Sequence, residues 1–268
     1  MAAFDDDLRL AHVLADAADD ISLRLFRSLD LKVDTKPDLT PVTEADRAVE
    51  ETVRSILSRA RPRDAVVGEE YGTSGNSARR WVVDPIDGTK NYVRGVPVWA
   101  TLIALLEGDQ PVVGVVSAPA LNRRWWASKG GGAWSGRSLA KATRCRVSAV
   151  SRLEDASLSF SSLTGWEEQG RLDYFLDLTR SVWRTRAYGD FWSHVMVAEG
   201  AVDLSMEPEL SLWDAAPLPL ILEEAGGRAT SLNGGPFTDG GALVCSNGLL
   251  HDAVLTQLNG GPIPLRRT

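Results

Sequence analysis

Two aspartates, Asp84 and Asp87, follow a short apolar run and precede a Gly-Thr pair. Mg²⁺ takes oxygen ligands in near-octahedral geometry, so both carboxylates and the Ile86 carbonyl could hold this ion and leave room for a phosphate. The N–H groups of Gly88 and Thr89 would then stand at a helix start, where unpaired donors and the helix dipole favour an anion. The stretch predicts a place where a metal ion and a phosphate meet.

Asp84 and Asp87 could instead do no more than cap a helix, which is a common role for Asp. The whole string Asp-Pro-Ile-Asp-Gly-Thr at 84–89 is more specific. It resembles the signature of the inositol monophosphatase superfamily of Mg²⁺-dependent phosphatases. The resemblance implies an αβαβα sandwich of the inositol monophosphatase/fructose-1,6-bisphosphatase type, two or three bound Mg²⁺ ions with Mn²⁺ as a substitute, and assembly as a homodimer.

A second motif places a carboxylate at the start of a predicted helix. Thr43 can cap this helix, and Asp46, three residues later, could complete a capping box. In the family, the Asp of such a loop-to-helix motif pairs with the Thr of the Asp-Gly-Thr turn to polarise the attacking water. The resemblance therefore implies that Asp46 and Thr89 form a catalytic pair.

Two further acidic residues match the family by motif. Glu69 belongs to a Gly-Glu-Glu sequence that ends a short apolar strand, where neighbouring carboxylates are usually solvated. Asp214 belongs to a Trp-Asp-Ala-Ala sequence and, by itself, would be a helix N-cap. The resemblance implies that Glu69 and Asp214 are metal ligands, so that one ion lies between Glu69, Asp84 and the Ile86 carbonyl and a second between three aspartates.

The substrate is indicated by two segments, 94–100 and 186–192, which resemble the branch of the family that hydrolyses histidinol phosphate. That molecule carries a cationic amine and an imidazole. Asp190 and Glu207 would suit a partly desolvated cation, because such a charge needs a counter-charge. An inositol phosphate or a broad range of small phosphates is the alternative substrate for the same chemistry.

A non-catalytic regulator that uses an acidic surface is the competing hypothesis of a different class. It does not require metal ligands, whereas every ligand that the family pattern demands is present. Cys145 and Cys245 lie far apart and outside any phosphate-binding signature, so we expect buried thiols and no covalent intermediate.

Charge and hydropathy exclude several classes of partner. The formal net charge of −7 and the isoelectric point near 5.1 argue against nucleic acid, because phosphate-backbone binding requires a basic surface. The longest nearly apolar run, 96–106, is too short for a bilayer, which needs about 20 residues. The acidic start of the chain is unlike a secretory signal. We expect a cytoplasmic protein whose partner is a small phosphorylated substrate.

The elements that must position these residues form two halves. Apolar steps of three and four predict a first helix over 8–25, and strands of an antiparallel meander follow over 96–127. A soft boundary near residue 147 divides an N-terminal half, 1–147, from a C-terminal half, 148–268, in which strands and helices alternate. The whole chain is thus predicted to be an α/β (α+β) protein.

Overall fold

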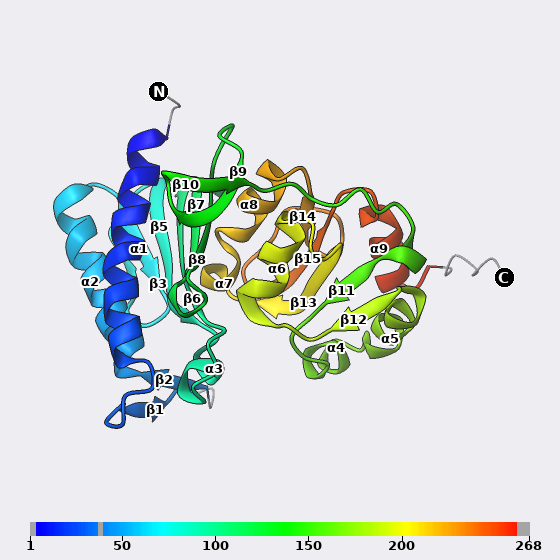
Figure 1. Ribbon diagram of the computed structural model, residues 1–268, viewed down its shortest axis with the longest axis horizontal. Helices are drawn as coiled ribbons and strands as arrows, with labels where there is room; N and C mark the ends of the chain where they lie inside the picture. The colour runs from blue at the N-terminus through cyan, green and yellow to red at the C-terminus, as the bar shows by residue number, and fades with distance from the viewer. Residues whose placement is uncertain (1–3, 37–39, 262–268) are drawn as a thin grey trace.

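Helices and β-sheets form alternating layers in the computed structural model, which describes residues 4–36 and 40–261 (Figure 1). The first layer contains two long helices, α1 (Asp5–Leu25) and α2 (Glu44–Ala60). Each turns an apolar stripe inward, because residues three and four apart share one helix face. The stripes bury Ala11, Leu14, Ala15 and Ala18 of α1 and Val49, Val53 and Leu57 of α2.

The second layer is an eight-stranded sheet in the order β10-β9-β8-β7-β6-β5-β3-β4. Its members are β3 (Ala65–Gly68), β4 (Gly72–Ser74), β5 (Arg79–Asp87), β6 (Ala100–Glu107), β7 (Gln110–Ala118), β8 (Arg123–Ser128), β9 (Ala133–Ser138) and β10 (Lys141–Arg144). Strands β5 to β10 pair antiparallel in chain order, so the predicted meander is confirmed, while β3 joins β5 in parallel.

Strand β6 begins four residues later than the apolar run from Val96 suggested. The β5–β6 register shifts between Asp84 and Asp87, and the Asn91 amide donates to the Val98 carbonyl instead of a strand partner. Trp99 packs edge-on against Tyr92 at 5.0 Å between ring centroids. The residues before β6 therefore support the short helix α3 (Thr89–Val93) that follows β5.

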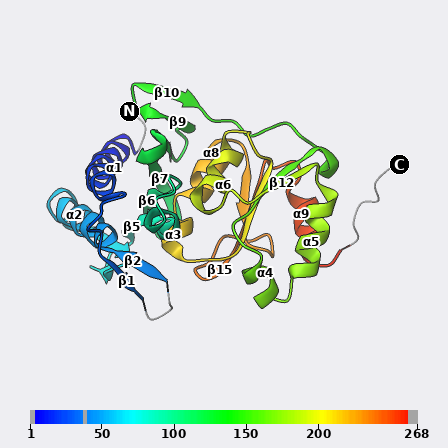
Figure 2. The ribbon, with the colours of Figure 1, turned by 60° about the horizontal axis from the view of Figure 1, so that its bottom comes forward.

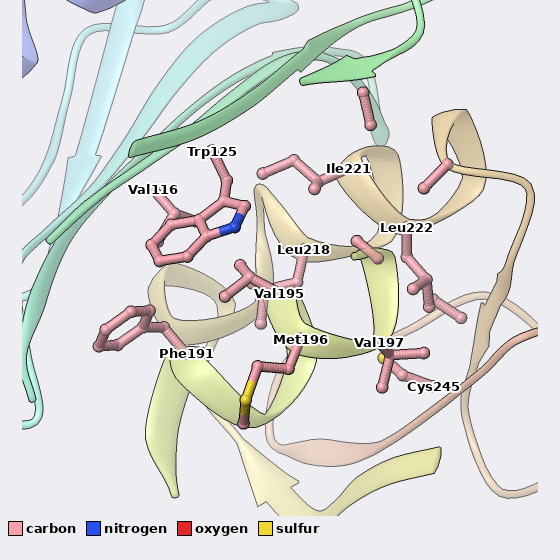
Figure 3. Close-up of a cluster of buried hydrophobic side chains, with 14 of the residues drawn as sticks. Val116, Trp125, Phe191, Val195, Met196, Val197, Leu218, Ile221, Leu222 and Cys245 are labelled. Carbon is pink, nitrogen blue, oxygen red and sulfur yellow. The ribbon is translucent and has the colours of Figure 1, made fainter. Parts of the chain in front are cut away.

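The third layer consists of α6 (Asp190–Ala198), α7 (Leu212–Ala215) and α8 (Leu218–Glu224). Figure 3 shows Val116 and Trp125 of the eight-stranded sheet facing Phe191 and Val195 of α6. Fully burying an aliphatic or aromatic side chain of this kind contributes about 1.5–3 kcal/mol. This cluster therefore joins the two halves of the chain into one packed unit around the site.

The fourth layer is a five-stranded sheet in the order β12-β11-β13-β15-β14. It contains β11 (Ser157–Ser159), β12 (Arg184–Arg186), β13 (Leu204–Leu210), β14 (Arg228–Thr230) and β15 (Gly241–Ser246). The pairs of β11 are parallel, which alternation of strands and helices favours, whereas those of β15 are antiparallel. Strand β13 includes Glu207.

The fifth layer covers the outer face of this sheet with α4 (Thr164–Glu168), α5 (Leu172–Ser181) and α9 (His251–Leu258). Figure 2 shows α1 and α2 at one side of the molecule and α5 and α9 at the other. The αβαβα prediction is confirmed. The large sheet ends at Arg144 and the smaller one begins at Ser157, but a domain boundary near residue 147 stays a prediction.

Two short strands, β1 (Val33–Thr35) and β2 (Pro41–Thr43), pair beside the start of α2. Residues 37–39, which lie between them, are outside the described residues. In the described part of the chain, no helix combines the length and apolar character needed to span a membrane.

Candidate active site

The end of β5 places the first two acidic residues. Asp84 is 1% exposed, and its Oδ1 accepts from the Ile86 N–H at 2.9 Å. Gly88 precedes α3 with φ of 85°, and an added Cβ would lie 3.0 Å from the Val98 carbonyl oxygen, so glycine is required there. Gly88 is the N-cap, and neither aspartate caps the helix.

A third acidic residue joins them from α7. Asp84, Asp87 and Asp214 each offer a carboxylate oxygen, and these oxygens lie within 4.8 Å of one another. Asp214 is not an N-cap, because it sits in the first turn of α7 and accepts from the Ser211 N–H at 3.1 Å. Asp87 accepts from the Phe191 N–H at 2.7 Å. Two elements, β5 and α7, therefore supply one group of oxygens, to which α6 donates a backbone N–H.

Burial and mutual repulsion disfavour the simultaneous ionisation of the three carboxyl groups when no cation is bound. Burial first, and then the charges of Glu69 and Asp214, raise the pKa of Asp84 well above its usual value. Burial, Asp190 and Asp214 do the same to the pKa of Asp87. Burial and Glu69 raise the pKa of Asp214 to about 6. A divalent cation would offset both the cost of burying the carboxylates and the repulsion between them, so these residues fit a metal ion.

Glu69 follows β3 and lies at the same cavity, but its carboxylate is outside this group of three. Its Oε1 lies 2.6 Å from the Lys36 Nζ, which also contacts Glu70 at 2.7 Å. Burial opposes the ammonium charge, but hydrogen bonds to both glutamates outweigh it and raise the pKa of Lys36. The ligand role of Glu69 stays a prediction. The contact of Lys36 with these two glutamates was not predicted from the sequence, although two adjacent half-buried acids favour a nearby cation.

Asp46 and Thr89 lie close enough to interact, although Asp46 also completes the capping box. The Thr43 N–H and hydroxyl donate to Asp46 Oδ2 at 2.8 and 2.5 Å. Asp46 Oδ1 lies 3.4 Å from the Thr89 hydroxyl, which also reaches the Ile86 carbonyl at 2.9 Å. Burial raises the pKa of Asp46 against the opposing effect of Thr43. The two interpretations of Asp46 are thus compatible.

A second acidic pair, Asp190 and Glu207, lines the same cavity, and Asp190 adjoins Phe191, whose N–H donates to Asp87. The Ser161 hydroxyl donates to Glu207 Oε1 at 2.5 Å and accepts from the Asp190 N–H at 2.9 Å. Burial, opposed by Ser161, raises the pKa of Glu207 to about 8. Asp190 has φ of 50° and accepts from the Asn91 amide at 3.0 Å. Ser161 and Asn91 were missed because each reaches its partner across a long sequence separation.

Most of these groups, though not Asp46 or Asp84, line one cavity of about 740 Å³. Its walls include Glu69, Asp87, Gly88, Thr89, Asp190, Glu207 and Asp214. The two cysteines lie elsewhere as buried free thiols, as predicted, and burial raises the pKa of Cys145 to about 11. Neither has the thiolate character of a nucleophile.

Comparison with known proteins agrees with this arrangement. The model of the inositol monophosphatase family matches residues 7–260. The chain belongs to this family. Its members are metal-dependent phosphatases that act on small phosphorylated substrates, and the group of Asp84, Asp87 and Asp214 could hold such a metal.

Among its relatives, a histidinol-phosphatase of Streptomyces coelicolor is 66% identical over 97% of this chain and 99% of that protein. A histidinol-phosphatase of Mycobacterium tuberculosis is 60% identical over 96% of this chain and 99% of that protein. An inositol monophosphatase structure from Zymomonas mobilis is 32% identical, covers 97% of this chain and 100% of its own, and has a TM-score of 0.85. The family and fold expectations are therefore confirmed.

Proposed function

We propose that the protein is a Mg²⁺-dependent histidinol-phosphatase that hydrolyses L-histidinol phosphate to L-histidinol and phosphate. The observation that supports it most is 66% identity to a histidinol-phosphatase over almost the full length of both chains. A cavity lined by acids that fit a metal ion and by two further carboxylates, those of Asp190 and Glu207, supports it independently. We further propose that the protein acts in the cytoplasm as a homodimer.

Glu69, Asp84, Asp87, Asp214 and the Ile86 carbonyl would hold two or three Mg²⁺ ions, with Mn²⁺ as a substitute. When bound, the ions neutralise the phosphate and activate the attacking water. The Thr89 hydroxyl, polarised by Asp46, orients that water. Backbone N–H groups of Gly88 and Thr89 receive the phosphate.

The reaction needs no covalent intermediate with the protein. The water oxygen forms its bond to phosphorus as the bond to the alcohol oxygen breaks, and the alcohol leaves with a proton. Asp190 and Glu207 take no part in this exchange. They bind the cationic amine and imidazole of histidinol phosphate, where a charge-assisted hydrogen bond contributes about 1.5–3 kcal/mol.

The metal sites predict how stability changes with pH. A carboxyl whose folded pKa is raised contributes stability that is complete below its unfolded pKa near 4 and lost as pH rises through the folded value, about 6 for Asp214. Mg²⁺ should replace the lost protons, so it should raise the melting temperature more at pH 8 than at pH 5. At 100 times Kd, the gain is about 2.7 kcal/mol, or roughly 5–10 °C. Equal shifts at both pH values, with EDTA-treated protein as the baseline, would argue against metal ions at these carboxylates.

Asp190→Asn should change substrate selectivity. Asn tolerates a positive φ and can still accept from the Asn91 amide, so the loop should keep its shape. The loss of charge should lower kcat/KM for histidinol phosphate by about one to two decades and leave inositol 1-phosphate nearly unaffected. The ratio of the two kcat/KM values in variant and parent is the measurement. An unchanged ratio would limit Asp190 to holding the turn beside Gly88.

A substrate panel tests the proposal as a whole. It should contain histidinol phosphate, inositol 1-phosphate, fructose 1,6-bisphosphate and 3′-phosphoadenosine 5′-phosphate, each with saturating Mg²⁺. We expect the highest kcat/KM for histidinol phosphate. A preference for inositol 1-phosphate would reject the substrate but keep the chemistry, and failure of all four would favour a non-catalytic role.

A further inference from the structure

Glu50 is a buried acid of α2 outside the cavity. It is 0% exposed, and its carboxylate accepts two backbone hydrogen bonds from the turn after β3. The Glu70 N–H donates to Oε2 at 2.7 Å, and the Tyr71 N–H donates to Oε1 at 3.2 Å. Burying a charged carboxylate costs free energy unless it is paired and hydrogen-bonded, so the hydrogen bonds of Glu50 indicate a role other than filling space.

The neighbours of Glu50 fix where its carboxylate lies. Arg54, one helical turn later, donates from Nε to Oε1 at 2.7 Å and also bonds the Gly72 carbonyl and the Ser74 hydroxyl of β4. On the other side, a Cβ added to Gly68 would lie 2.0 Å from Glu50 Oε1. The carboxylate therefore packs directly against Gly68, the glycine of the Gly-Glu-Glu sequence.

Glu69 is the residue that this arrangement encloses. Its own N–H donates to the Val83 carbonyl of β5 at 3.3 Å, and the next two N–H groups of the chain donate to Glu50. The backbone of Glu69 is thus held on both sides, while its side chain meets the Lys36 ammonium at the cavity.

We propose that Glu50 is a positioning residue for the metal site. Held by Arg54, its carboxylate fixes the turn over 68–71 so that Glu69 presents its side chain to the cavity. The inference rests on the proposed function, in which Glu69 is a metal ligand. This role explains why Glu50 is fully buried beside that ligand. It also explains why residue 68 is a glycine although its φ is not positive, since a Cβ there would collide with the Glu50 carboxylate.

Glu50→Gln tests this role by direct metal binding. One end of a Gln amide is a donor, so it cannot accept from both backbone N–H groups and from Arg54. Loss of partners that orient a metal ligand typically costs about 10–100-fold in metal affinity, and we expect a loss of that size. Mn²⁺ is the probe, because the electron paramagnetic resonance signal of the free ion reports binding without any turnover.

Glu224→Gln is the matched control. Glu224 likewise accepts from two backbone N–H groups of one loop, those of Gly130 at 2.6 Å and Gly132 at 2.8 Å, but this loop joins β8 to β9. The same substitution removes the same kind of contact there. We expect Mn²⁺ affinity equal to that of the parent, whatever the change in melting temperature.

Gly68→Ala supplies a second test if Glu50→Gln fails to fold. The added methyl should push the Glu50 carboxylate off the turn while leaving its charge, and it should weaken Mn²⁺ binding to a similar degree. Mn²⁺ affinity equal to that of Glu224→Gln in the folded variants would overturn the inference.

Glu69→Gln separates the inference from the proposed function. If Glu69→Gln weakens Mn²⁺ binding but Glu50→Gln and Gly68→Ala do not, only the positioning role of Glu50 fails. If Glu69→Gln binds Mn²⁺ as the parent does, the ligand role of Glu69 fails, and the inference fails with it.

Discussion

Asp84→Asn is expected to abolish turnover while the protein remains folded. Asp84 is 1% exposed and belongs to the acidic group, and Asn has nearly the same shape but no charge to share with a cation. Loss of several kcal/mol of transition-state stabilisation should lower kcat by roughly 10³-fold or more. Removing one of three repelling acids should not destabilise the metal-free protein, because burial already raises the pKa of Asp84.

Asp203→Asn is the control for this variant. Asp203 is also a buried aspartate and accepts from the Ser157 N–H at 2.6 Å, but it is not part of the acidic group or the cavity wall. It should lose stability and keep its turnover per folded molecule. The measurements are steady-state phosphate release and thermal unfolding of both variants. Normal hydrolysis by Asp84→Asn would mean that this carboxylate is only structural.

Thr89→Ala should lower kcat far more than it raises KM. The hydroxyl is proposed to act on the water in the transition state, while backbone N–H groups still bind the phosphate. Groups that assist proton transfer contribute about 10²–10⁴-fold, and we expect a loss in that range. Thr89→Ser keeps the hydroxyl and should restore most of the rate. A serine variant as slow as the alanine variant would show that the methyl group, and not the hydroxyl, matters.

Asp46→Asn tests whether the 3.4 Å contact between Asp46 and Thr89 works as one unit. If it does, Asp46→Asn should show a similar deficit, and the double variant should be little slower than either single one. The capping role of Asp46 should appear separately as lost stability, about 1 kcal/mol. Losses that multiply in the double variant would disprove a shared function.

Local motifs made part of the site predictable. The string at 84–89 joins a buried strand to a helix start, so the positions of Asp84, Asp87 and the Gly-Thr turn follow from neighbouring residues alone. Asp214 lies much further along the chain and reaches the same place through β13 and α7. Only the family resemblance linked it to Asp84, because spacing carries no information about such contacts.

Tertiary contacts account for what was not predicted. Lys36, Ser161 and Glu50 each act on residues 20 to 46 positions away, and their residue types alone are unremarkable. The late start of β6 has the same origin, because Trp99 packs with Tyr92 instead of extending a strand. The mixture of helices and strands was easier to predict, since apolar patterns report burial directly, whereas the αβαβα layering was implied only by the family resemblance.

Phosphate release from L-histidinol phosphate by metal-stripped protein tests the central claim most directly. The protein is treated with a chelator, passed into metal-free buffer, and assayed before and after Mg²⁺ is added. Our account predicts no release above background before addition and steady release afterwards, with Asp84→Asn inactive in both conditions. Release by the stripped parent at its full rate, or none after Mg²⁺ is restored to folded protein, would contradict a metal-dependent histidinol-phosphatase.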